Sequence, residues 1–141
     1  MKVKEIMTKD VAYINPSSTI VEAAQIMQKH NVGSVPVCDQ SGLVGIVTDR
    51  DIVVRNVAHG TDPHSTIVKN VMTSQITSVS PDMDVREVSD IMSRSQIRRL
   101  PVVENNQLVG IVALGDIATD SRFDTEAGEA LTDISMPNKT M

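Results

Sequence analysis

The sequence predicts an α+β fold of two β-α-β-β-α repeats that pack sheet to sheet with pseudo-twofold symmetry. Shifted by 65 positions, residues 3–52 align without a gap on residues 68–117 and are identical at 17 of 50 positions. The run LVGIV occurs intact in both copies, at 43–47 and 108–112. Three strands and two helices in about 50 residues cannot bury both faces of a sheet, so each repeat needs the other.

Each repeat is expected to open with a short strand, over residues 11–14 in the first copy and 76–79 in the second. Alternating or continuous apolar residues favour strands there. Pro16 and Pro81 follow, and a proline cannot continue a β-ladder. The two prolines therefore mark the ends of these strands.

A helix is predicted after each opening strand. Thr19-x-x-Glu22 and Asp84-x-x-Glu87 are capping-box patterns, which mark helix starts. Apolar residues then recur at helical spacing, which predicts one buried face for each helix. They are Ile20, Ala23, Ala24 and Met27 in the first repeat and Val85, Val88, Ile91 and Met92 in the second.

A hairpin and a second helix complete each repeat. The polar connections DQSG and ENNQ are typical of turns between antiparallel strands. The predicted strands are 35–38 and 43–47 in the first repeat and 100–103 and 108–112 in the second. We expect the second helices to begin after residues 47 and 112.

The repeats define the predicted domain boundaries. The first repeat spans 1–60, the second 61–122 and a C-terminal tail 123–141, with 59–70 as the polar connector. Within the tail, residues 126–135 are expected to form a short helix, and the end MPNKTM is expected to fray.

The composition excludes several function classes. The chain has one Tyr, one Phe and no Trp, so an aromatic platform for single-stranded nucleic acid is excluded. The net charge of −5 gives no global positive field, and we expect no nucleic-acid partner. No secretory signal and no run near about 18 apolar residues is recognisable, so we expect no membrane partner and a cytoplasmic location.

Recognisable catalytic and metal-binding patterns are absent from the sequence. It contains no P-loop, GxGxxG, GxSxG or HExxH motif, so we assign no catalytic residue and expect no enzyme. His59 and His64 are separated by Gly60 and Pro63, which favours a polar linker over a metal site. The single Cys38 excludes an intrachain disulfide, and its apolar surroundings favour a buried inert thiol.

Three phrases recur in order at the same period. They are VKEIMT (3–8) and VKNVMT (68–73), SVPV (34–37) and RLPV (99–102), and GIVTDRD (45–51) and GIVALGD (110–116). Over residues 3–119 the chain resembles the cystathionine-β-synthase (CBS) domain pair, or Bateman module. The resemblance implies a stand-alone regulatory module with two clefts between the repeats, which binds adenine nucleotides or related adenosyl ligands and forms a homodimer.

The ligands that the resemblance implies are AMP, ADP or ATP, with S-adenosylmethionine or NAD as further possibilities, and no cofactor is required. The regulated partner protein is unidentified. The alternative is a structural or dimerisation module whose clefts have degenerated.

Two interpretations fit Thr48 and Asp51, which stand where a strand enters a helix. As ligand groups, Asp51 would accept hydrogen bonds from a ribose diol and Thr48 would donate one to a phosphate, beside the first helical N–H groups near Arg50. As structural groups, they form a capping box. In the second repeat Ala113 cannot cap but Asp116 remains, which indicates either a separate role or helix-dipole complementarity.

Arg98 and Arg99 supply local positive charge at a predicted helix-to-strand turn. Arginine binds phosphate bidentately and keeps its charge, so the pair is a candidate phosphate site. The alternative is a solvated turn.

In the pattern that the resemblance implies, the aspartate of one repeat faces the basic turn of the other. One cleft then holds the phosphate-binding groups, and the other is empty or takes an uncharged adenosyl group. The main cleft would contain Ile46, Thr48, Arg50, Asp51, Gln75, Ile76, Thr77, Arg98 and Arg99. The weaker cleft would contain Val11, Ala12, Gly33, Ser34, Ile111 and Asp116.

Overall fold

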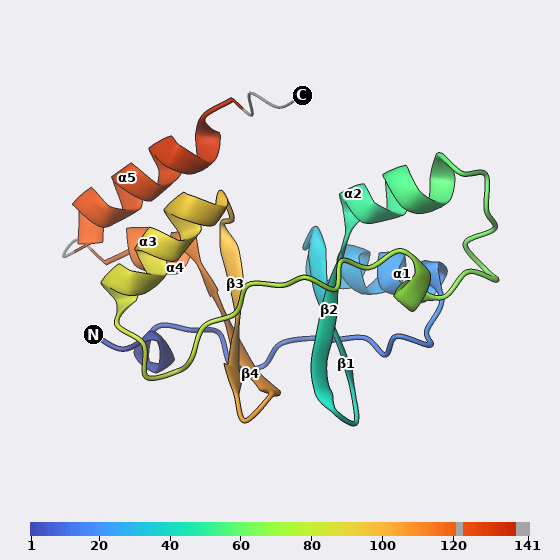
Figure 1. The fold of residues 1–141 in the computed structure, drawn as a ribbon, viewed down its shortest axis with the longest axis horizontal. Coiled ribbons are helices and arrows are strands. Elements are labelled where there is room, and N and C mark those ends of the chain that lie inside the picture. The colour runs from blue at the N-terminus through green and yellow to red at the C-terminus, as the bar shows by residue number, and fades with distance from the viewer. Residues whose placement is uncertain (121–122, 138–141) are drawn as a thin grey trace. The chain divides into compact units, whose positions relative to one another are not determined.

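A computed structural model describes residues 1–120 and 123–137 and confirms the α+β class, with two antiparallel two-stranded sheets and flanking helices (Figure 1). The chain divides into two compact units. The α1 unit comprises Ala12–Ile76 and Asn106–Leu108, and the α3 unit comprises Met1–Val11, Thr77–Asn105 and the described residues from Val109 on. The predicted packing of the two sheets on each other stays a prediction.

The α1 unit is built around one hairpin. Its elements are α1 (Ile20–His30), β1 (Ser34–Asp39), β2 (Gly42–Thr48), α2 (Asp49–Ile52), the π-helical segment η2 (Val53–Val57) and the 3-10 turn η3 (Val68–Asn70). Strand β1 pairs antiparallel with β2, with Val35 opposite Val47 and an irregularity between Val37 and Cys38.

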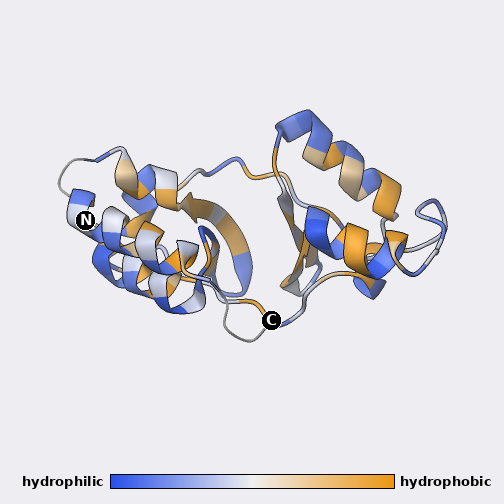
Figure 2. Ribbon diagram, turned by 90° about the horizontal axis from the view of Figure 1, so that it is seen from above, coloured by the Kyte–Doolittle hydropathy of each residue, from blue (hydrophilic) through white to orange (hydrophobic). Residues whose placement is uncertain are grey.

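The α3 unit repeats this plan and adds one helix. Its elements are η1 (Val3–Glu5), α3 (Val85–Ser95), β3 (Arg99–Glu104), β4 (Gln107–Ala113), α4 (Leu114–Ala118) and α5 (Asp124–Ser135). In both units hydrophobic positions recur along the helices between hydrophilic ones, as amphipathic helices require (Figure 2).

The first helix of each unit begins where the capping pattern predicts. The Thr19 hydroxyl accepts a hydrogen bond from the Glu22 N–H at 3.2 Å. The Asp84 carboxylate accepts one from the Arg86 N–H at 2.9 Å, one position earlier than a capping box would use. Each side chain satisfies a donor that the helix itself leaves free.

The predicted opening strands are wrong as strands. Residues 11–14 and 76–79 contribute single parallel bridges, Ile14 to Val37 and Val79 to Val102. Two prolines explain this on the first repeat: Pro36 lacks the N–H that would extend the ladder on one side of Ile14, and Pro16 lacks it on the other. One bridge is all that the sequence allows.

The opening phrase of each repeat packs in the unit that the other repeat mainly builds. Val3 lies in the core of the α3 unit, whereas Val68 and Val71 lie in the core of the α1 unit. The backbone of Thr73 pairs with Ile46, and that of Thr8 with Ile111. The boundaries at residues 60 and 122 describe sequence repeats and stay a prediction, while the compact units exchange these phrases.

The glycine of each LVGIV run allows this close pairing. A Cβ atom on Gly45 would lie 2.9 Å from the Thr73 carbonyl oxygen, and one on Gly110 would lie 2.8 Å from the Thr8 carbonyl oxygen. Real side chains do not approach backbone that closely, so the two bridges require glycine.

The predicted C-terminal helix is confirmed and begins two residues early, at Asp124. The predicted fraying concerns residues 136–141, of which 138–141 lie outside the described residues. Within the part of the chain that the structure describes, no helix is long and apolar enough to cross a membrane.

Replacing Gly45 by Ala is expected to lower the free energy of unfolding by about 1–3 kcal/mol, because the new methyl group must displace the Thr73 backbone. Urea denaturation followed by circular dichroism measures this loss. The control is Gly128→Ala in α5, where the new Cβ meets nothing within 4 Å and helix propensity rises by about 1 kcal/mol. Equal stability of the two variants would contradict the steric argument.

Candidate functional site

Thr48 and Asp51 form a capping box at the start of α2, as one of the two interpretations predicts. The Asp51 N–H donates to the Thr48 hydroxyl, and the Thr48 N–H donates to Asp51 Oδ2, each at 3.0 Å. Asp51 is 9% exposed, so its carboxylate is held at a fixed place at the edge of the unit. Capping fixes this carboxylate without using all of its acceptor capacity.

Thr73 is a site residue that sequence reasoning missed. Its hydroxyl donates to both Asp51 carboxylate oxygens at 3.4 Å, and its backbone exchanges two hydrogen bonds with Ile46 at 2.8 and 2.9 Å. The signal was present, because the Met-Thr pair of the opening phrase is identical in both repeats. The predicted neighbours Gln75 and Ile76 belong to no strand.

Arg55 adds positive charge beside this carboxylate. Its Nη1 donates to the carbonyl oxygens of Val71 and Met72 at 3.0 Å each and lies 3.8 Å from Asp51 Oδ1. The guanidinium therefore links the Asp51 carboxylate to the carbonyl groups at the end of η3. Asp51, Thr73 and Arg55 form one polar cluster within the α1 unit.

The second repeat explains why Asp116 persists without a hydroxyl partner. The Ala113 N–H donates to Asp116 Oδ2 at 2.8 Å, which is the carboxylate half of the capping box. The other half is missing, because an alanine side chain cannot accept from the helix. A structural role is thus sufficient to account for Asp116.

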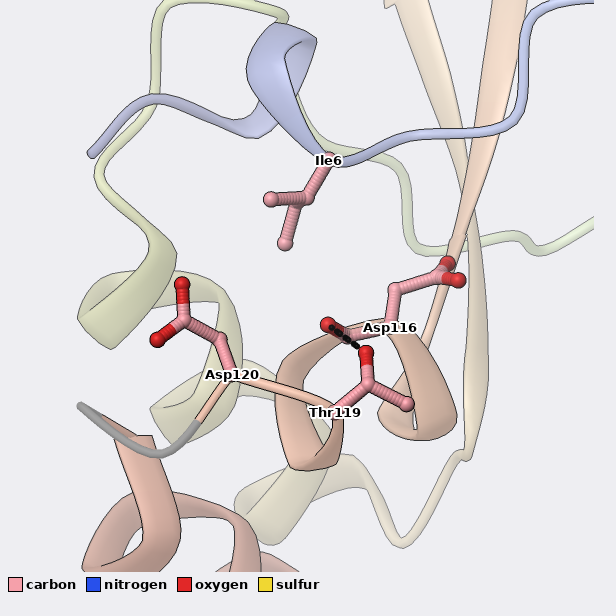
Figure 3. A pocket seen from close by; sticks show the side chains of 4 residues that line it. All are labelled: Ile6, Asp116, Thr119 and Asp120. Atoms are coloured by element: carbon pink, nitrogen blue, oxygen red, sulfur yellow. Dashed lines mark hydrogen bonds between the residues drawn. The ribbon is translucent and has the colours of Figure 1, made fainter.

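The position of Arg55 is occupied by Asp120 in the second repeat. There the α3 unit has a pocket of about 460 Å³ lined by Ile6, Asp116, Thr119 and Asp120 (Figure 3). The Thr119 hydroxyl donates to the Asp116 carbonyl oxygen at 3.1 Å. Where the first repeat places an arginine, the second places a carboxylate.

The two helix-to-strand turns also differ in charge. The Arg98 carbonyl oxygen accepts the Leu114 N–H at 2.8 Å, and the Gly33 carbonyl oxygen accepts the Asp49 N–H at 2.9 Å. The backbone is therefore alike in both units, while the side chains of Arg98 and Arg99 extend into solvent in only one.

The residues of the two predicted clefts are divided between the two units. Those in the α1 unit are Ala12, Gly33, Ser34, Ile46, Thr48, Arg50, Asp51, Gln75 and Ile76. Those in the α3 unit are Val11, Thr77, Arg98, Arg99, Ile111 and Asp116. The predicted meeting of residues from different units in one cleft stays a prediction.

The structure also bears on thiol reactivity and on metal binding. Burial, with a smaller contribution from Asp39, raises the pKa of the Cys38 thiol above its ordinary value, which disfavours the reactive thiolate. Among residues 1–120 and 123–137, no group of three or more His, Cys, Asp and Glu side chains could hold a metal ion.

Comparison with known proteins identifies the repeat. The family model for the CBS domain matches residues 3–56 and residues 68–121. The CBS domain-containing protein YhcV of Bacillus subtilis is 48% identical over 136 residues, which cover 96% of each chain.

Two solved structures have a similar fold. The crystal structure of Hypoxic Response Protein I with two coordinated zinc ions has a TM-score of 0.78 and 35% identity, covering 84% of this chain and 98% of that one. The CBS domain pair of protein MJ0100, in complex with 5′-methylthioadenosine and S-adenosyl-L-methionine, has a TM-score of 0.73 and 32% identity, covering 84% and 94%.

Replacing Ala113 by Thr is expected to raise the free energy of unfolding by about 1 kcal/mol, because a hydroxyl would complete the capping box of α4. The backbone at Ala113 already has the conformation of the Thr48 cap: φ and ψ are −115° and 155° at Ala113 and −112° and 161° at Thr48. Chemical denaturation measures the gain. The reverse substitution in the first repeat, Thr48→Ala, should lower the free energy of unfolding by a similar amount. If neither variant changes the free energy of unfolding, the capping argument is wrong.

Proposed function

Because the chain belongs to the CBS domain family and carries the domain twice, we propose that it is a regulatory module that binds an adenine nucleotide or related adenosyl ligand. The observation that supports this is the fixed Asp51 carboxylate at the start of α2, which is 9% exposed. The signal would pass to a partner protein.

Asp51 is suited to a ribose diol. A carboxylate offers about four acceptor positions, and the Thr48 N–H occupies one of them closely. The contacts of Oδ1, to Thr73 at 3.4 Å and Arg55 at 3.8 Å, are long, so this oxygen retains capacity for a ligand hydroxyl. The cap thus holds the ligand group in place before binding, which lowers the entropic cost.

The phosphate would be bound by Arg98 and Arg99, whose guanidinium groups are exposed. A phosphate near Asp116 would instead meet a second carboxylate, Asp120, in the same pocket. We therefore propose one site for a phosphorylated adenosine, at Asp51. The Asp116 site would be empty or take an uncharged adenosyl group.

The candidate ligands are AMP, ADP and ATP, followed by S-adenosylmethionine and NAD. MJ0100, at 32% identity, binds 5′-methylthioadenosine and S-adenosyl-L-methionine in its crystal structure, which supports the adenosyl class. We further propose that the chain is a homodimer and catalyses no reaction. Its cytoplasmic location stays a prediction.

AMP is expected to raise the melting temperature of the wild-type protein by about 5–10 °C at a hundredfold excess over its Kd, because it binds the folded state alone. Asp51→Asn keeps the size of the side chain and should reduce the shift with both AMP and adenosine. Arg99→Ala should remove only the advantage of AMP over adenosine. Differential scanning fluorimetry measures each shift against the same variant without ligand.

Asp116→Asn is the matched control, since it alters the equivalent carboxylate of the second repeat and should leave the AMP shift intact. A protein that no adenosyl ligand stabilises would overturn the proposal and favour a structural module.

A further inference from the structure

A methionine precedes the paired threonine in both opening phrases, Met72 before Thr73 and Met7 before Thr8. Neither methionine is fully enclosed, because each is only partly buried. Met72 packs against the hydrophobic core of the α1 unit, and Met7 packs against that of the α3 unit. The two side chains therefore lie at the boundary between core and solvent, beside the backbone pairing of each threonine.

The sulfur of each methionine lies over the glycine of an LVGIV run. A Cβ atom on Gly45 would lie 2.8 Å from Met72 Sδ, and one on Gly110 would lie 2.7 Å from Met7 Sδ. The flexible thioether thus fills the space that a side chain at the glycine would take. No further atom fits between sulfur and glycine, so a larger group at Sδ requires the side chain to move.

Met72 is also directly connected to the polar cluster around Asp51. Its carbonyl oxygen accepts a hydrogen bond from Arg55 Nη1 at 3.0 Å. The next residue, Thr73, exchanges two backbone hydrogen bonds with Ile46 and donates its hydroxyl to Asp51. A displacement of Met72 therefore reaches both the backbone pairing and the carboxylate through the adjacent residue.

We propose that Met72 and Met7 are modification sites for a peroxide, and that their oxidation loosens the pairing of each opening phrase. Hydrogen peroxide transfers one oxygen atom to the sulfur. The thioether is oxidised by two electrons to a sulfoxide, and the peroxide is reduced to water. The sulfoxide is larger and polar, so it is accommodated neither against the glycine nor by the hydrophobic core beside it.

The oxidised side chain turns towards solvent, and the opening phrase loses its contact with the hairpin. In the α1 unit this change withdraws Thr73 from Asp51, so the candidate ligand site is altered together with the fold. The inference goes beyond the proposed nucleotide binding and does not depend on it, because its test needs no nucleotide.

The test measures amide hydrogen exchange of single residues by NMR on the full chain, before and after treatment with hydrogen peroxide. Mass spectrometry locates each sulfoxide. Met7→Leu leaves Met72 oxidisable, and Met72→Leu leaves Met7 oxidisable, so the two variants are matched controls for each other. Leucine is close to methionine in volume, and both variants should therefore fold.

In the oxidised Met7→Leu protein, the amides of Thr73 and Ile46 should exchange at least about tenfold faster than before treatment. The equivalent pair in the α3 unit, Thr8 and Ile111, should not change. The other variant should show the reverse pattern. Enzymatic reduction of the sulfoxide should restore slow exchange in both.

Met136, which follows α5 and is 56% exposed, provides a further control. Met136→Leu should respond to peroxide as the wild type does. A sulfoxide at Met72 that leaves the exchange of Thr73 unchanged overturns the inference, as does a change at both pairs in each single variant. If Met72 and Met7 stay reduced while Met136 is fully oxidised, the inference is also overturned, because the oxidant then does not reach them in the folded protein.

Discussion

The backbone pairing of Thr73 with Ile46, and of Thr8 with Ile111, is the constraint on which the rest of the structure depends. It places the opening phrase of each repeat against the hairpin of the other. Val68 and Val71 complete one core and Val3 the other, so neither repeat has a full core without its counterpart. Glycine in LVGIV is the condition for this contact, because a Cβ there would overlap a backbone carbonyl.

The same pairing builds the candidate site. It carries Thr73 to the carboxylate of Asp51, which the capping box has already fixed at the start of α2. The cap and the ligand role were alternatives at the level of sequence, yet one carboxylate has enough lone pairs to serve both. A group that must be immobile to recognise a diol is well served by being part of a helix cap.

The helix starts and the hairpins could be predicted from the sequence, because capping residues and polar turns act locally. Their recurrence at a period of 65 then predicted the α+β class of two repeats. The exchange of opening phrases was not predictable in the same way. Val3 and Val68 are equally apolar in either arrangement, and only the three-dimensional contact decides which core each joins. The opening strands failed for a local reason, the prolines at 16 and 36, whose combined effect depends on the register of a pairing that the sequence does not state.

Of the site, the Thr48–Asp51 pair was predictable. The repeated Met-Thr pair marked Thr73, but its contact with Asp51 was not predictable, because it spans 22 positions of chain. The two repeats differ in the polar groups around the equivalent carboxylates Asp51 and Asp116. Ala113 removes a cap acceptor, and Asp120 replaces the arginine that pairs with Asp51 in the first repeat. A duplicated element that keeps its backbone while dividing its side chains in this way is free to bind a ligand with one copy. The other copy can then retain its aspartate for the helix alone, which is a sufficient physical reason for a motif to survive without its hydroxyl.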